Sequence, residues 1–122
     1  MPDHAVEVEK ITERMSPITT HVLDSCAGRP AAGIPVTLEY WNSPRGWAPL
    51  GQGRTDMDGR VRDLLPDGHV LEPGLYQLLF DTSSRSGFFP EVVLRFRVED
   101  PRQHFHLPLL LGPFSFTTYR GS

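Results

Sequence analysis

Residues 104–111 read His-Phe-His-Leu-Pro-Leu-Leu-Leu, and the alternation within them predicts a β-strand with two unlike faces. Successive side chains of a strand point to opposite sides of its sheet. The face that is expected to join a hydrophobic core carries Phe105, Leu107, Leu109 and Leu111. The two histidines lie on the opposite, polar face, so the stretch predicts a half-buried strand that presents imidazoles away from the core.

The same two-residue period recurs upstream. One face of residues 91–98 carries Val92, Leu94, Phe96 and Val98, and one face of residues 34–41 carries Ile34, Val36, Leu38 and Tyr40. Turn residues separate about eight expected strands, at 18–23, 34–41, 47–55, 60–64, 75–81, 91–98, 104–111 and 114–119. No window carries an apolar period of 3.6 residues, and only the connection 83–87 has room for one helical turn. These strand lengths predict a two-sheet sandwich.

Composition bounds the remaining possibilities. The 122 residues suffice for one domain, and the net charge of −3 gives no reason to expect a nucleic-acid or membrane partner. The single cysteine, Cys26, permits no disulfide within the chain, and no apolar run approaches the roughly 18 residues of a membrane helix. Residues 1–16 mix charged and isolated apolar side chains, which predicts a disordered lead-in before a domain at 17–122. A soluble, cytoplasmic protein is expected.

Four short segments carry ionisable or otherwise reactive side chains at positions where a strand pattern predicts unreactive residues. His21 lies within a strand on the face opposite Val22, and the Asp58-Gly59 turn delivers Arg60 at the start of another strand. His104 and His106 share a strand face. The chain then reads Tyr119, Arg120, Gly121 and Ser122 at its end.

Each segment also has a plain structural interpretation. A single histidine on a strand is usually a satisfied surface or interface residue, and an arginine after a turn is usually solvated. A His-x-His pair is a simple way to aim two imidazoles at one metal, and with His21 as a third nitrogen ligand the set predicts a zinc-dependent hydrolase as one alternative. Cys26 has no obvious base or helix N-terminus beside it to activate a thiol nucleophile.

Taken in order, the segments resemble the 5-hydroxyisourate hydrolase branch of the transthyretin-like family. The resemblance rests on Thr19-Thr20-His21-Val22-Leu23-Asp24, Thr55-Asp56-Met57-Asp58-Gly59-Arg60, His104-Phe105-His106-Leu107-Pro108-Leu109-Leu110-Leu111 and the final Tyr119-Arg120-Gly121-Ser122. It covers residues 17–122. Any one motif is weak, but the ordered set is specific.

The resemblance implies an all-β, transthyretin-like sandwich of two antiparallel sheets with one short helix. It implies a homotetramer, a dimer of dimers, whose active sites lie at the interface between dimers. The implied reaction is hydrolysis of 5-hydroxyisourate to 2-oxo-4-hydroxy-4-carboxy-5-ureidoimidazoline in purine (urate) breakdown, without metal or cofactor. The implied catalytic residues are His21, Arg60 and His106. The implied substrate-binding residues are His104, Tyr119, Arg120, Gly121 and Ser122.

The side-chain chemistry agrees with that implication. Opening a ring needs water activated near neutral pH, to which imidazole is suited, and arginine offers a fixed fork of donors to a developing oxyanion. The sequence leaves open which histidine is the general base. It also leaves open a non-enzymatic, transthyretin-like module that binds a small ligand, although His21, Arg60 and His106 would spoil an apolar channel.

Overall fold

The computed structural model describes residues 16–66 and 68–121, and the regular elements in these ranges are all β-strands. In chain order they are β1 (Ile18–Asp24), β2 (Arg29–Pro30), β3 (Pro35–Asn42), β4 (Gly46–Arg54), β5 (Arg60–Val61), β6 (Gly74–Asp81), β7 (Glu91–Val98), β8 (Phe105–Leu111) and β9 (Phe116–Thr118). The all-β class is confirmed. Nothing in the described ranges is a helix of the length and apolarity that a membrane span requires. Residues 1–15, expected to form a disordered lead-in, lie outside the described residues.

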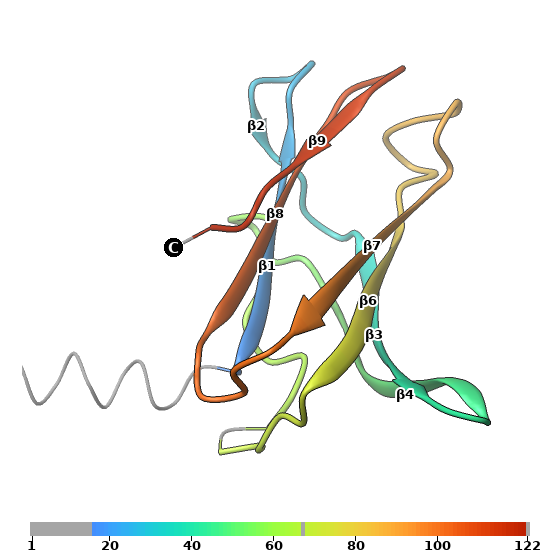
Figure 1. The fold of residues 1–122 in the computed structure, drawn as a ribbon. Helices are drawn as coiled ribbons and strands as arrows, with labels where there is room; N and C mark the ends of the chain where they lie inside the picture. The colour runs from blue at the N-terminus through green and yellow to red at the C-terminus, as the bar shows by residue number, and fades with distance from the viewer. Residues whose placement is uncertain (1–15, 67, 122) are drawn as a thin grey trace, which may run out of the picture.

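The strands form two facing sheets (Figure 1). One sheet has the order β4-β3-β6-β7 and is antiparallel throughout. The other has the order β2-β1-β8-β9, and β5 also pairs with β1. Its central pair, β1 and β8, is parallel, so the expectation of purely antiparallel sheets is wrong at this pair. A parallel pair needs a long crossover connection, and here the whole of the other sheet lies between the two strands in sequence.

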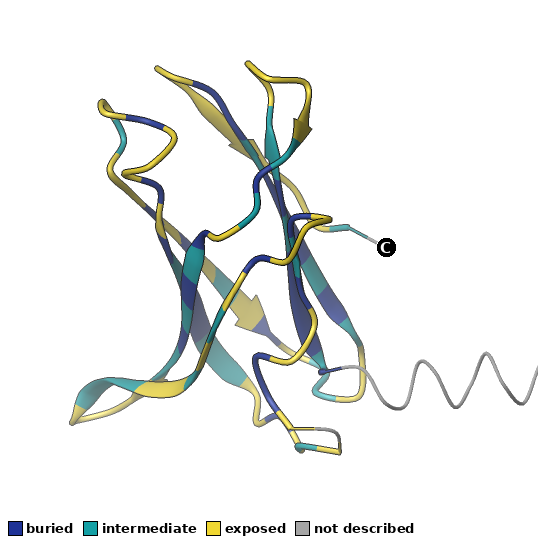
Figure 2. Cartoon of the chain, turned by 180° about the vertical axis from the view of Figure 1, so that it is seen from behind, coloured by how far each residue is buried: buried dark blue, intermediate teal, exposed yellow. Residues whose placement is uncertain are grey.

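The core lies between the two sheets, and the alternation of the sequence accounts for it. The side chains that face inward include Val36, Leu38, Leu78, Phe80, Val92, Leu94, Phe105, Leu107, Leu109 and Leu111, all buried. Figure 2 shows the buried residues concentrated where the sheets face each other. The core faces predicted for residues 34–41, 91–98 and 104–111 are therefore confirmed. The polar face predicted for His104 and His106 is in consequence the outer face of its sheet.

A single turn occupies the connection in which a short helix was expected. The carbonyl of Thr82 accepts hydrogen bonds from the N–H groups of Arg85 and Ser86, both at 2.9 Å. The buried Ser86 hydroxyl accepts the N–H of Phe89 at 3.0 Å and draws the chain back toward β7. No further hydrogen bond of this kind is present in the described residues before Pro90, which lacks an N–H. The described residues thus contain a turn here, and not the expected helix.

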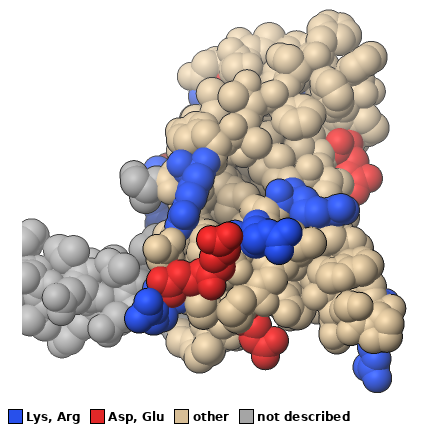
Figure 3. Space-filling view, viewed as in Figure 1, with Lys and Arg blue, Asp and Glu red and all other residues tan. Residues whose placement is uncertain are grey.

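Charged groups of both signs lie on the face seen in Figure 3. One ion pair joins the two sheets at one end, because Arg85, in the turn after β6, lies 3.2 Å from the carboxylate of Asp24 at the end of β1.

At the other end of β1, Ser16 is only 1% exposed. Its hydroxyl donates to the carbonyl of Ile18 at 2.7 Å and accepts the N–H of Leu65 at 3.2 Å. Ser16, which was expected in the lead-in, is therefore buried and bonded to the start of β1.

Candidate active site

The outer face of the sheet that contains β1 and β8 collects the predicted catalytic side chains. In the β1–β5 register, His21 lies opposite Arg60. In the β1–β8 register, Thr19 lies opposite His106. Thr19 and His21 are two residues apart on one strand and therefore share a face. Three segments that are distant in sequence thus bring His21, Arg60 and His106 to one surface, as the sequence predicted.

The turn before β5 fixes Arg60 through its main chain. The carboxylate of Asp56 accepts the N–H groups of Asp58 and Arg60, both at 2.9 Å. Gly59 has φ +77°, a conformation that favours glycine, and its carbonyl accepts the N–H of Val22 at 2.7 Å. The Asp-Gly-Arg turn is consequently bonded to β1 itself, and this bond sets Arg60 beside His21.

Thr19 connects the two histidines of the His-x-His pair. Its Oγ1 lies 2.9 Å from His104 Nε2 and 2.8 Å from His106 Nδ1. The side chain of Thr19 is nearly inaccessible, at 2% exposure, whereas both histidines are half-buried. Thr19 was not among the predicted site residues. The available signal was its place two residues before His21, because residues at that spacing share a strand face.

The C-terminal segment reaches the same face through Gly121. Its N–H donates to the carbonyl of His106 at 2.8 Å, and a Cβ at this position would lie 2.7 Å from His106 Cδ2. Figure 1 shows the segment after β9 lying on the side of β8 away from the other sheet. Gly121 therefore adjoins His106, as expected for a tail that lines the site. Ser122, also predicted to line it, lies outside the described residues.

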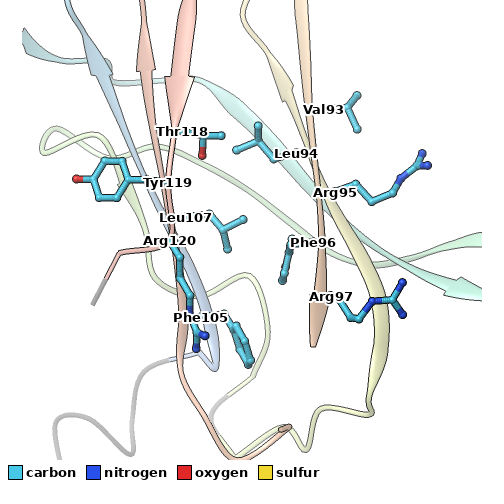
Figure 4. A pocket seen from close by; sticks show the side chains of 10 residues that line it. All are labelled: Val93, Leu94, Arg95, Phe96, Arg97, Phe105, Leu107, Thr118, Tyr119 and Arg120. Carbon is cyan, nitrogen blue, oxygen red and sulfur yellow. The ribbon is translucent and has the colours of Figure 1, made fainter. Parts of the chain in front are cut away.

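Tyr119 and Arg120 differ in where they point. Tyr119 is 59% exposed, and in Figure 4 its ring is directed away from the space between the sheets. Arg120 turns the other way: its guanidinium carbon lies 4.6 Å from the centre of the Phe105 ring, and its Nη2 donates to Gln103 Oε1 at 2.8 Å. Phe105 belongs to the core face of β8, so Arg120 in this conformation does not join the histidines.

Burial and positive charge both lower the pKa values of the imidazoles. Burial is the main cause of the lowered pKa of His106, and the charge of Arg60 is the next largest, followed by His104 and His21. The pKa of His21 is lowered by burial and then by Arg60, and that of His104 by burial. A lowered pKa keeps an imidazole neutral, and thus able to accept a proton, at and somewhat below neutral pH.

A groove beside the β8–β9 edge does not contain these residues. A groove of about 430 Å³ opens between β7 and the β8–β9 edge, where Leu94, Phe96, Phe105 and Leu107 point into it (Figure 4). Its lining includes neither His21 nor Arg60 nor His106. The histidines lie on the outer face of their sheet, where His21, Arg60 and His106 are each partly buried.

The zinc alternative finds no support in the side-chain arrangement. Among the residues that the structure describes, no three or more His, Cys, Asp or Glu side chains are grouped so that they could hold a metal ion. His104 and His106 are linked through the Thr19 hydroxyl, which forms a hydrogen bond with one nitrogen of each ring.

Cys26 is exposed in the turn after β1, and its N–H donates to the Asp24 carboxylate at 3.0 Å.

Comparisons with known proteins find relatives over almost the whole of the chain. The model of the HIUase/Transthyretin family matches residues 18–121. A mouse 5-hydroxyisourate hydrolase is 42% identical over 114 residues, which cover 88% of this chain and 96% of the mouse protein. A bifunctional uric acid degradation protein of Arabidopsis thaliana is 44% identical over 132 aligned residues and 97% of this chain. The chain spans only 41% of that plant protein.

Solved structures match the fold over most of both chains. The 5-hydroxyisourate hydrolase of Klebsiella pneumoniae superposes with a TM-score of 0.73 at 31% identity, covering 86% of this chain and 97% of that one. Sea bream transthyretin in complex with thyroxine superposes with a TM-score of 0.78 at 27% identity, covering 87% of this chain and 95% of that one. The backbone fold therefore matches both a 5-hydroxyisourate hydrolase and a thyroxine-bound transthyretin, so it does not distinguish between these two functions.

Proposed function

Because the chain belongs to the HIUase/Transthyretin family, we propose that it is an enzyme that hydrolyses 5-hydroxyisourate to 2-oxo-4-hydroxy-4-carboxy-5-ureidoimidazoline in urate breakdown. The observation that carries this proposal is the placement of His21, Arg60 and His106 on one sheet face. The curated relatives named 5-hydroxyisourate hydrolase support the same activity.

The reaction opens a cyclic amide by adding water to its carbonyl. A neutral imidazole takes a proton from water as the new C–O bond forms, and the carbonyl oxygen becomes an oxyanion. The C–N bond then breaks, and the departing nitrogen takes the proton back from the imidazolium. The product retains that nitrogen in its ureido group and the attacked carbon in its carboxylate. Two groups are thus required: a base that is neutral near pH 7 and a fixed positive charge.

His106 is the better placed of the two candidate bases. Its imidazole contacts Thr19 and adjoins Gly121, so its ring is oriented from two sides, and its pKa is lowered, chiefly by burial. His21 lies on β1 opposite Arg60 of β5, and its proposed role is to orient water or the leaving nitrogen. Arg60 lies close enough to lower the pKa values of both histidines. Its guanidinium anchors the carbonyl-rich substrate and stabilises the oxyanion.

A homotetramer with its sites between dimers would cover the histidine face. The histidine face is the outer face of its sheet, and large apolar side chains are exposed near the ends of the sheets, including Phe88 at 65%, Phe114 at 76% and Phe116 at 37%. Exposed apolar groups of this size are typical of surfaces that are covered in an assembly. Light scattering after size exclusion is expected to give four times the monomer mass. A fully active monomer would contradict the interface site.

The activity is tested by generating 5-hydroxyisourate in place from urate and urate oxidase and following its decay by ultraviolet absorbance. Decay that accelerates in proportion to the protein, with a metal chelator present, is the expected result. Activity that is lost with chelator and restored by zinc would favour the metal-dependent hydrolase. A folded tetramer without any effect would favour a transthyretin-like binding protein, the alternative that the thyroxine complex of sea bream transthyretin represents. A cytoplasmic location remains a prediction for cell fractionation.

A further inference from the structure

The Thr19 hydroxyl is a single proton donor that faces two imidazole nitrogens. His104 Nε2 and His106 Nδ1 lie 2.9 and 2.8 Å from Thr19 Oγ1, and both distances are those of well-formed hydrogen bonds. A hydroxyl carries one hydrogen and two lone pairs. Among the described residues its hydrogen-bond partners are these two rings alone, so its hydrogen goes to one ring and it accepts an N–H from the other. When both rings are neutral, the tautomer of one consequently fixes the tautomer of the other.

Two arrangements satisfy this restriction. In the first, Thr19 donates to His106 Nδ1, so the proton of His106 resides on Nε2 and that nitrogen cannot act as a base. In the second, His106 donates its Nδ1–H to Thr19, and Thr19 donates onward to His104 Nε2, so that His104 carries its proton on Nδ1. Only the second arrangement leaves His106 Nε2 with a free lone pair, on the side of the ring away from Thr19.

We propose that Thr19 and His104 are positioning residues that hold the proton of His106 on Nδ1 and so leave Nε2 as the basic nitrogen. The catalytic consequence rests on the proposed function, whereas the tautomers themselves do not. This arrangement also survives proton transfer, because a His106 imidazolium still donates Nδ1–H to the same hydroxyl and no group has to turn. The role assigns His104 to the orientation of His106 instead of to contact with substrate.

The surroundings favour the second arrangement. A backbone hydrogen bond to Thr19 raises the pKa of His106, against the lowering by burial, Arg60, His104 and His21. A main-chain carbonyl can only accept, so this contact favours a protonated nitrogen on the side of the ring that faces Thr19. Burial lowers the pKa of His104, which favours the neutral ring, and only a neutral ring can offer Nε2 as an acceptor. His104 has to be neutral, because a charged His104 would donate to Thr19. The hydroxyl of Thr19 would then have no acceptor on the side of His104.

The decisive variant is Thr19→Val, which replaces the hydroxyl by a methyl group of similar size. Thr19→Ser keeps the hydroxyl and tests for rescue. The matched control is Thr20→Val, because Thr20 is also buried on β1 and its hydroxyl donates to the carbonyl of Leu107, on the core face away from the histidines. The tautomers are measured by ¹⁵N chemical shifts of the imidazoles at a pH where both rings are neutral. The rate constants for 5-hydroxyisourate are measured separately.

The expected spectrum of the wild type shows His106 protonated on Nδ1 and His104 protonated on Nδ1. Thr19→Val is expected to move His106 toward the Nε2-protonated form and to lower kcat at least about tenfold, with KM changed less than about threefold. Thr19→Ser and Thr20→Val are expected to keep the wild-type tautomers and kcat. Wild-type rings protonated on His106 Nε2, or tautomers unchanged by Thr19→Val, would overturn the inference whatever the activity.

A second variant separates positioning from substrate contact. In His104→Phe the acceptor of the Thr19 hydroxyl is lost, so Thr19 becomes free to donate to His106 Nδ1, and kcat is expected to fall as in Thr19→Val. If His104 instead binds substrate, KM rises while the tautomer of His106 stays, and the inference fails. A wild-type protein without hydrolase activity would remove the proposed function but would leave the tautomer measurements decisive for the coupling.

Discussion

The backbone N–H of Gly121 donates to the carbonyl of His106 at 2.8 Å, and this bond seats the C-terminal segment against the imidazole itself. A methyl group on Gly121 would lie 2.7 Å from His106 Cδ2, which is closer than real side chains approach. The ring of His106 is therefore confined by the tail on one side and bonded to Thr19 on the other.

Gly121→Ala is expected to displace the His106 ring or the tail and to lower kcat roughly tenfold or more, since catalysis by a base depends on its position. Steady-state rates for 5-hydroxyisourate measure the effect. Gly87→Ala is the matched control, because nothing lies within 4 Å of the added methyl group there and the backbone is not strained. Equal rates for both variants and the wild type would show that the tail does not position His106.

His106→Ala is expected to lower the rate at least about 100-fold, which is the usual scale for losing a general base. The fold should survive, because His106 lies on the outer face of its sheet and contributes nothing to the core. Circular dichroism and thermal unfolding check the fold, and the decay assay checks the rate. His69→Ala is the control, since His69 lies in the loop before β6, away from the site. A fully active His106→Ala would refute the assignment.

Arg60→Gln is expected to raise the pKa values of His21 and His106, because the charge of Arg60 lowers both. Because its pKa is lowered, the wild-type base stays neutral when the pH falls to the ordinary pKa of imidazole, and the enzyme is expected to stay active there. In the variant the acidic limb of the rate profile should lie at higher pH, along with a loss of roughly 100-fold or more in rate from the missing oxyanion donor.

Titration of the imidazoles by NMR measures the shift independently of the activity. Arg62→Gln is the control for charge, because Arg62 is exposed beside β5 and does not contribute to either lowered pKa. Histidine pKa values that stay constant in Arg60→Gln would mean that burial alone lowers them.

Gly59→Ala is expected to destabilise the protein by about 1–3 kcal/mol and to lower the activity. Its φ of +77° strains any other residue, and an added methyl group would also collide with the Val22 carbonyl. Gly28→Ala carries the same backbone strain, at φ +68°, with open space around the methyl group. Urea unfolding should therefore show a smaller cost for Gly28→Ala, near 1 kcal/mol. Equal costs would show that the contact with β1 is unimportant.

The sequence predicted those parts of the fold that depend on local alternation. The core faces of β3, β7 and β8 follow from a two-residue period, which each strand displays by itself. The two-residue strand β2 was missed, because Arg29 and Pro30 resemble an ordinary turn until β1 pairs with them. The parallel pairing of β1 with β8 was also missed, since no local pattern tells a strand which distant partner it will take.

The same distinction holds for the site. His21, Arg60 and His106 were predicted from their motifs, and the pairing of three strands brings them together. The bridging role of Thr19 was not predicted, because it arises only from the strand register that sets Thr19 beside His106, 87 positions away. The direction of Arg120 was not predicted either, since stacking on Phe105 and a bond to Gln103 compete with the histidine face.

The parallel pairing of β1 with β8 also governs when this protein can fold. Strand β1 is made early, but its central partner follows about 87 residues later, as the bond from Thr20 to Leu107 shows. During synthesis the antiparallel β3–β4 and β3–β6 pairs can form before β8 is available to pair with β1. Closing so long a loop is slow, because its entropic cost precedes the contacts that reward it. Until β8 is made, the edge of β1 that will pair with it carries unpaired backbone amides and carbonyls. This edge is therefore the segment to which we expect a chaperone to bind.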